Sequence, residues 1–283
     1  MFVDYHIHTE FSDDSEYEME QVVKDAIAMG MEEICFTDHV DYGIKRDWDD
    51  ESGMLYRRGG KGEPEFMPLA NVDYPRYFEK ISRLRKNYEG QIRIKQGMEF
   101  GIQSHTIAEY EKLFSGYPFD FIILSVHQIE NKEFWNGEFQ RELTRSEYYR
   151  KYYSEMLTLV ETFHNYSVLG HMDLISRYDK EGEFSFEEVR PIIRRILQTV
   201  IEDGKGIEIN TSCYRYGLTD LTPGREILKM YRELGGRIIT IGSDSHKREH
   251  LGDHIPETLA QLKEMGFESV CTFDRMQPVF HQL

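Results

Sequence analysis

The chain has 283 residues, a formal net charge of −17 and three cysteines. A chain this acidic argues against binding to nucleic acid or to an anionic membrane, because both require basic surface. The sparse cysteines form no paired metal motif and are typical of a reducing compartment. No apolar stretch near the N-terminus has signal or transmembrane length, so we expect a cytoplasmic protein.

Apolar, β-rich runs alternate along the chain with segments of helical periodicity. About seven or eight such alternations without a break in composition predict a parallel sheet, and their repetition favours a barrel in a single domain, residues 1–283. No Gly-x-Gly-x-x-Gly follows the first strand, which counts against a dinucleotide-binding fold. The expected strands cover residues 3–8, 33–37, 92–100, 119–126, 167–171, 206–210, 237–242 and 268–273, and the expected helices 16–29, 74–88, 107–113, 145–164, 186–203, 223–234 and 255–265.

One segment, residues 42–73, does not follow this alternation. It shows no periodicity, and glycines and prolines occur in it among charged and aromatic residues: Gly59, Gly60, Gly62, Pro64 and Pro68. An irregular insertion of this length in a compact domain is usually functional, for example as a lid over a site. The alternative is a solvated excursion without a role.

Histidines and acids follow the predicted strands. His6 and His8 stand one residue apart in the opening strand, so both side chains lie on one face and can hold one cation. His-x-His alone is a weak motif, and a polar loop after a half-buried strand would explain it equally well. Because active sites of barrels form at the C-terminal ends of the strands, we expect all such residues to converge there. They are His6, His8, His39, Glu99, His127, His171, Asp244 and His246.

The types of these residues indicate a metal site. Histidine and carboxylate without thiolate suit Zn²⁺, Mn²⁺ or Fe²⁺. Together with Asp13 or Asp14 the set is too large for one ion, so two to three divalent ions are expected, with Glu99 between them. A multi-metal site lowers the pKa of bound water and stabilises charge on the attacking and leaving oxygens, which suits hydrolysis of a phosphate ester.

Several short motifs together resemble the PHP (polymerase and histidinol phosphatase) family over nearly the whole chain. The segments Thr-Asp-His-Val-Asp, Glu-x-Asn-Thr-Ser and Arg177-Tyr178 are most similar to its histidinol-phosphatase branch. The motifs that carry the family resemblance are His6-x-His8, Thr37-Asp38-His39, Gly97-x-Glu99, Ser125-x-His127, Gly170-His171-x-Asp173 and Ser243-Asp244-Ser245-His246.

This resemblance implies a distorted (β/α)7 barrel of the TIM-like type that holds a trinuclear metal centre. Relatives often have a histidine where Asp14 stands, and some place the acid one residue earlier, so Asp13 is the alternative ligand. The implied ligand sets are His6, His8, Glu99 and Asp244 for one ion; Glu99, His127 and His171 for a second; and Asp14, His39 and His246 for a third.

The resemblance also implies hydrolysis of L-histidinol phosphate to L-histidinol and phosphate, a step of histidine biosynthesis. A metal-bridging hydroxide would attack phosphorus in line. Three residues of the centre are expected to take part directly, with Asp244 or a histidine passing a proton to the leaving oxygen: Asp244, His246 and Glu99. Arg177 and Arg215 are candidates for phosphate contacts, since guanidinium matches phosphate oxygens, and Asn210 for orienting water or substrate.

Three other functions stay open at this point. A PHP phosphoesterase of another substrate, such as a nucleotide or phosphotyrosine, would have the same chemistry. An amidohydrolase also begins with His-x-His on a barrel, but it usually has a metal-bridging lysine at a strand end. Here Glu99 holds that position and Lys95 lies four residues earlier. A non-catalytic, metal-binding PHP module often lacks some ligands, whereas this chain has a full set.

Overall fold

Parallel strands form the central sheet of the protein. The computed structural model describes residues 1–50, 52, 55–58, 66–182 and 184–283. Strand order in the sheet is β1-β2-β6-β7-β10-β11-β12, and the short strand β3 also pairs with β6. The bounds are β1 (Val3–Ile7), β2 (Glu33–Phe36), β3 (His39–Val40), β6 (Arg93–Gly101), β7 (Phe121–Ser125), β10 (Val168–Leu169), β11 (Gly206–Asn210) and β12 (Ile239–Gly242).

The two ends of this sheet meet and nearly close it. Ile7 in β1 forms a parallel bridge with Ser245, which follows β12. The backbone N–H of His8 donates to the carbonyl of Ser245 at 2.7 Å, and the N–H of Ser245 donates to the carbonyl of His6 at 3.1 Å. The predicted distorted (β/α)7 barrel is therefore confirmed.

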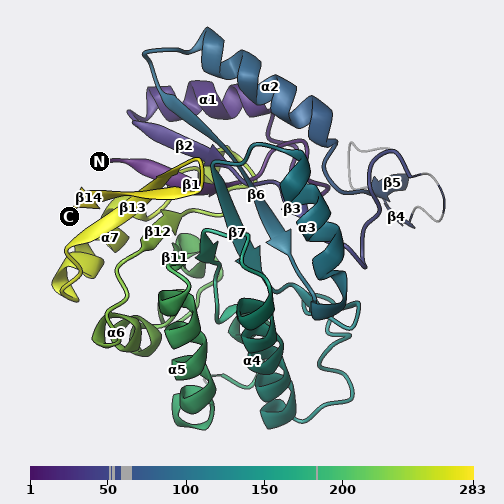
Figure 1. The fold of residues 1–283 in the computed structure, drawn as a ribbon, viewed down its shortest axis with the longest axis vertical. Coiled ribbons are helices and arrows are strands. Elements are labelled where there is room, and N and C mark those ends of the chain that lie inside the picture. Colours follow the sequence, from purple (N-terminus) through teal and green to yellow (C-terminus); the bar gives the residue numbers. More distant parts are fainter. Residues whose placement is uncertain (51, 53–54, 59–65, 183) are drawn as a thin grey trace.

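Helices surround the barrel on its outer face (Figure 1). They pack through one apolar stripe each. In α5 the buried residues Val189, Ile193, Ile196, Leu197 and Val200 recur every three to four positions, which is the spacing of one helix face. The helices are α1 (Met19–Ala28), α2 (Tyr74–Asn87), α3 (Ile107–Gly116), α4 (Arg145–Thr162), α5 (Phe186–Glu202), α6 (Arg225–Glu233) and α7 (Ile255–Glu264). No helix in the described part of the chain is long and apolar enough to span a membrane.

The interior of the barrel is filled by side chains at the end opposite to the histidines. Tyr5 in β1 and Phe121 in β7 come from strands that are not adjacent, and their ring centroids lie 5.0 Å apart across the interior. Phe273 contacts Phe121 from outside the barrel sheet, with centroids 5.1 Å apart. The amino end of the barrel is therefore a packed core, and within the barrel interior the room for a site lies at the carboxyl end.

The expectation that residues 268–273 complete the β/α alternation was wrong. This strand, β13 (Ser269–Asp274), pairs antiparallel with β14 (Gln277–Gln282), and the pair is separate from the barrel sheet. The connecting residues Arg275 and Met276 both have positive φ, 46° and 64°. A two-residue turn of this kind matches the twist of a hairpin, which is why the chain turns back here.

The expected insertion, residues 42–73, is partly regular. Its described residues include β4 (Leu55–Arg58) and β5 (Phe66–Leu69), which pair antiparallel. Gly59, Gly60, Gly62 and Pro64 lie outside the described residues. The remaining short elements are β8 (Gln128–Ile129), β9 (Lys132–Glu133), η1 (Ser104–Thr106), η2 (Leu174–Tyr178), η3 (Thr211–Cys213) and η4 (Arg248–His250).

Candidate metal centre

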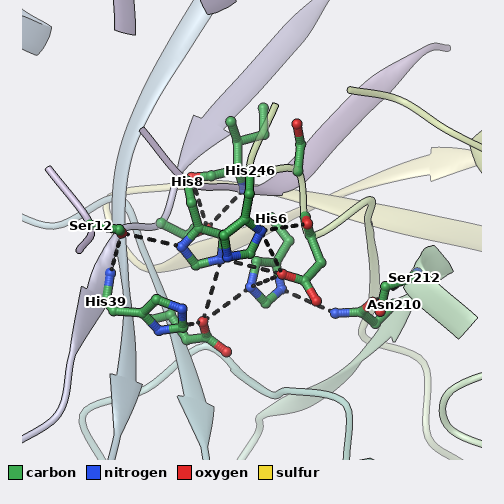
Figure 2. A network of polar contacts seen from close by, with 12 residues as sticks. His6, His8, Ser12, His39, Asn210, Ser212 and His246 are labelled. Atoms are coloured by element: carbon green, nitrogen blue, oxygen red, sulfur yellow. Dashed lines mark hydrogen bonds and ion pairs between the residues drawn. The ribbon is translucent and has the colours of Figure 1, made fainter. Parts of the chain in front are cut away.

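The structure brings the histidines and acids at the strand ends together at the carboxyl end of the barrel. Each is placed by a strand or by the first residues after one, because parallel strands all end at the same rim. Only Asp14 lies further along the chain, in the turns between β1 and α1. Figure 2 shows the rings of His6, His8, His39 and His246 gathered around carboxylate oxygens.

Glu99 in β6 lies at the centre of this group, with its side chain 1% exposed. Its Oε1 is 2.7 Å from Nε2 of His171 and 3.1 Å from Nε2 of His127. Its Oε2 is 3.0 Å from Nδ1 of His39 and 3.2 Å from Nε2 of His6. One buried carboxylate therefore faces ring nitrogens from several strands, which is the position of a bridging ligand.

Asp244 supplies a second carboxylate from the end of β12. Its Oδ1 lies 3.4 Å from Nε2 of His8 and 3.7 Å from Nε2 of His6. The same atom is 3.6 Å from Nδ1 of His246. Asp244 has a φ of 56°, and such strained backbone in a non-glycine residue clusters at functional sites.

Asp14, rather than Asp13, lies beside the remaining histidines. Its Oδ2 is 3.0 Å from Nε2 of His246 and 3.4 Å from Nε2 of His39. Asp13 instead accepts a hydrogen bond from Nζ of Lys45 at 2.6 Å. The geometry therefore favours Asp14 between the two alternatives that the sequence left open.

The chemistry of this group fits divalent cations. Five of its buried atoms make no hydrogen bond of acceptable geometry to the described residues: Nε2 of His6, Nε2 of His8, Nδ1 of His39, Oε2 of Glu99 and Nδ1 of His171. Such unpaired buried polar atoms are costly unless something else binds them. Four overlapping sets have donor atoms within 4.8 Å of one another: His8, Asp14, His39 and His246; His6, Glu99 and His171; His6, His8 and Asp244; and His39, Glu99 and His127.

Two further buried acids contact histidines of this group, a role that the sequence did not predict for either of them. The carboxylate of Glu208, in β11, lies against Nδ1 of His6. Asp41 Oδ1 lies 2.9 Å from Nδ1 of His127. Both contacts leave Nε2 of the histidine directed at Glu99, and such partners fix the ring orientation of metal ligands. A buried acid between two isoleucines in a strand was the available signal for Glu208.

The pKa shifts in this group also favour a positive charge beside its carboxylates. Burial lowers the pKa of His6, but the carboxylates of Glu208 and Glu99 outweigh it and raise this pKa well above its ordinary value. Burial raises the pKa of Glu99, but His6 and His127 outweigh it and hold this pKa well below its usual range. The carboxylates thus favour a proton on His6, whereas burial and the neighbouring histidines lower the pKa of His8, and a bound cation would take the place of the proton on His6.

A cavity of about 580 Å³ opens over the group and has room for a small ligand. Histidines and acids of the group line it together with aromatic side chains, including His171, Trp135 and Tyr216. Ile44 and Leu69, from the expected insertion, also line it. The insertion therefore contributes to the wall of the site.

The two arginines that the sequence pointed to lie on the same side of the centre. Nη2 of Arg177 is 3.7 Å from Oδ2 of Asp244, and its Nε is buried and makes no hydrogen bond. Arg177 lines the cavity. Arg215 donates from Nη1 to the carbonyl of Ser243 at 2.7 Å and holds the loop after β12. Nη2 of Arg177 also donates to Oγ of Ser212 at 2.6 Å, and of the two arginines Arg177 is the one that lines the cavity.

Two further residues do not line the cavity. Asn210 is fully buried next to the centre: its Nδ2 lies 3.5 Å from Nδ1 of His6, and its Oδ1 accepts a hydrogen bond from the N–H of Ser212 at 3.0 Å. Nζ of Lys95 lies 2.8 Å from Asp274, next to the β13–β14 hairpin at the amino end. Lys95 is therefore not placed to act as the metal-bridging lysine of an amidohydrolase.

Comparison with known proteins identifies the family. A histidinol-phosphatase of Lactococcus lactis is 35% identical over 280 residues, covering 97% of this chain and 95% of the relative. A probable histidinol-phosphatase of Thermotoga maritima is 27% identical, covering 94% and 93%. The crystal structure of the L. lactis histidinol phosphate phosphatase, complexed with zinc, L-histidinol and phosphate, superposes with a TM-score of 0.80 at 34% identity, covering 98% of both chains. The PHP domain matches residues 4–212, and the chain belongs to the PHP family.

Proposed function

We propose that this protein hydrolyses L-histidinol phosphate to L-histidinol and phosphate, as a step of histidine biosynthesis. The observation that carries the proposal is the buried group of histidines and acids around Glu99, which lies under a cavity that Arg177 also lines. The similarity to histidinol-phosphatases extends over nearly the whole chain, which supports the choice of substrate. Cys35, Cys213 and Cys271 are free thiols, which suits action in the cytoplasm.

Two to three divalent cations fit the centre, and Zn²⁺, Mn²⁺ and Fe²⁺ all suit its donors. When bound, they lower the pKa of water and neutralise charge on the phosphate oxygens. The L. lactis relative was solved with zinc, which makes Zn²⁺ the first ion to test. Following the family resemblance, we assign His6, His8, Glu99 and Asp244 to one ion; Glu99, His127 and His171 to another; and Asp14, His39 and His246 to a third. Within these sets, the donors of His6, His8 and Asp244 lie within 4.8 Å of one another, as do those of Asp14, His39 and His246, and His127 and His171 both face Oε1 of Glu99.

The other residues of the site position the substrate and the proton. Arg177 places a guanidinium beside Asp244, where it can bind two phosphate oxygens and align the ester for attack. Asp244 and His246 both line the cavity, so either can pass a proton to the leaving oxygen. Arg215 supports this arrangement through the backbone of Ser243 and Asp244.

Replacing Arg177 with alanine is expected to raise KM for L-histidinol phosphate by about tenfold or more, since a hydrogen bond to a charged group contributes roughly 1.5–3 kcal/mol. The metal content should stay as in the wild type, because Arg177 is not one of the metal donors. Steady-state kinetics with metal analysis of the same preparation checks both parts. An unchanged KM would remove Arg177 from the phosphate site.

Replacing Glu208 with glutamine is expected to weaken zinc binding by about 10–100-fold, the usual effect of losing a residue that orients a ligand. The glutamine amide places no negative charge beside Nδ1 of His6, so Nε2 of His6 becomes a weaker ligand for zinc. Competition with a zinc indicator measures the affinity. Glu202→Gln, at the end of α5 and before β11, is the matched control and should bind zinc as the wild type does.

The substrate proposal is tested by steady-state turnover of L-histidinol phosphate beside a panel of nucleotides, phosphotyrosine and simple phosphomonoesters. A higher kcat/KM for L-histidinol phosphate, lost on chelation, is the expected result. Metal-dependent turnover without this preference would overturn the substrate but keep the chemistry. Bound metal without turnover of any ester would favour the non-catalytic module.

A further inference from the structure

A second cavity, of about 360 Å³, lies between α4, α5 and the segment 217–227. It shares no lining residue with the cavity over the metal centre. One side of it is aromatic, with Tyr149 and Phe184 stacked at 4.0 Å between ring centroids. The reaction proposed at the metal centre does not involve this second cavity.

The charged side chains that line this second cavity are all acidic within the described part of the chain. Asp179 is paired with Arg145, at 2.7 Å from Nε, and Asp220 is paired with Arg225. Glu226 forms no such ion pair among the described residues. The cavity thus keeps negative charge that its surroundings do not neutralise.

Asp173 provides an independent sign that something binds here. Its Oδ2 accepts a hydrogen bond from the N–H of Gly224 at 2.7 Å, but its Oδ1 is buried and makes none. This oxygen is closed off from the cavity, so the carboxylate of Asp173, which lines the cavity, is only partly compensated, and a cationic amine in the cavity would compensate its charge. Aromatic walls and an unpaired carboxylate together suit a flat ring that carries an amine.

The same features exclude a phosphate ester. No lysine or arginine is among the described lining residues, and the nearby Arg145 and Arg225 are paired with Asp179 and Asp220, so they do not compensate a phosphate group, which Glu226 would repel. A dephosphorylated amine with an aromatic or imidazole ring has the opposite properties. The product of the proposed reaction, L-histidinol, is such a molecule, so this choice of ligand rests on the proposed function.

We propose that this second cavity is a binding site for a small amine with an aromatic or imidazole ring and no phosphate, and that its occupancy affects hydrolysis. The short helix η2 forms the wall between the two cavities. Asp173 and Ser176 line the second cavity, whereas Leu174 and Arg177 line the cavity over the metals. A ligand that engages Asp173 therefore acts at the start of the helix that carries Arg177.

Calorimetric titration of the zinc-loaded enzyme with L-histidinol tests the site. The wild type should bind two molecules per chain, one at the metal centre and one in the second cavity. Val189→Phe places a ring in the second cavity from α5 and should bind one, with kcat for L-histidinol phosphate within about twofold of the wild type. Glu226→Gln should weaken the second site by about tenfold. Glu233→Gln, also on α6 but outside the cavity, is the matched control.

Inhibition kinetics give a second readout. L-Histidinol should inhibit the wild type with a non-competitive component that Val189→Phe lacks. One molecule per chain in the wild type, with purely competitive inhibition, would overturn the site; if Val189→Phe does not fold, Glu226→Gln decides. Two bound molecules without turnover of L-histidinol phosphate would instead refute the proposed function and leave the site standing.

Discussion

Replacing Glu99 with glutamine is expected to lower kcat for L-histidinol phosphate by more than about a hundredfold, beyond the 10–100-fold typical of residues that only orient a metal ligand. The amide has the same shape, but it carries no charge and only one acceptor oxygen. Glu99 faces His6, His39, His127 and His171, so the substitution removes the negative charge shared by all of them. Steady-state kinetics at saturating zinc measures the loss.

Metal content separates this effect from simple unfolding. The Glu99→Gln protein should bind fewer zinc ions per chain by elemental analysis, while its far-UV circular dichroism stays close to that of the wild type. Glu89→Gln, an exposed position between α2 and β6, is the matched control and should keep both zinc and activity. A Glu99→Gln protein with wild-type zinc content and kcat would exclude Glu99 as a bridging ligand.

The positions of the ligands were predictable from the sequence because they depend on local pattern. An almost wholly apolar run such as β7 predicts a strand buried on both faces, and the residues that follow it must lie at the rim. His127 and His171 are placed in this way, and the structure brings them within 3.1 Å and 2.7 Å of Glu99. Strand periodicity alone therefore accounts for most of the site.

The residues that the sequence did not reveal act through contacts between distant strands. Glu208 supports His6 across 202 positions of the chain, and Asp41 supports His127 across 86. No local pattern encodes such a pairing, since it depends on strand order and register. The same holds for β13, whose composition resembles a barrel strand although its partner is β14.

Removal of the metal is expected to abolish turnover and to lower the unfolding temperature. Ligands that bind only the folded state stabilise it, and a cation at 1,000 times its dissociation constant contributes about 4 kcal/mol, or roughly 10 °C for a chain of this size. Dialysis against a chelator should bring kcat to background, and added Zn²⁺ should restore it. Calorimetry before and after dialysis measures the change in unfolding temperature.

The stability lost on metal removal should grow with pH. Burial lowers the pKa of His127, but Glu99 and Asp41 outweigh it and raise this pKa to about 9. This value lies above the pKa of about 6.5 in the unfolded chain. In the metal-free protein, protonated His127 therefore contributes fully to the free energy of unfolding below pH 6.5, and this contribution is lost as pH rises through 9.

With the cation bound, no such proton is needed, since the metal supplies the positive charge beside Glu99. The gap in unfolding temperature between the zinc-loaded and the metal-free protein should therefore widen from pH 6.5 to 9. His164→Gln, at an exposed histidine beyond α4, is the control and should leave this pH dependence unchanged. A gap that is constant over this range would mean that protons do not replace the cations, and that the buried carboxylates are balanced in some other way.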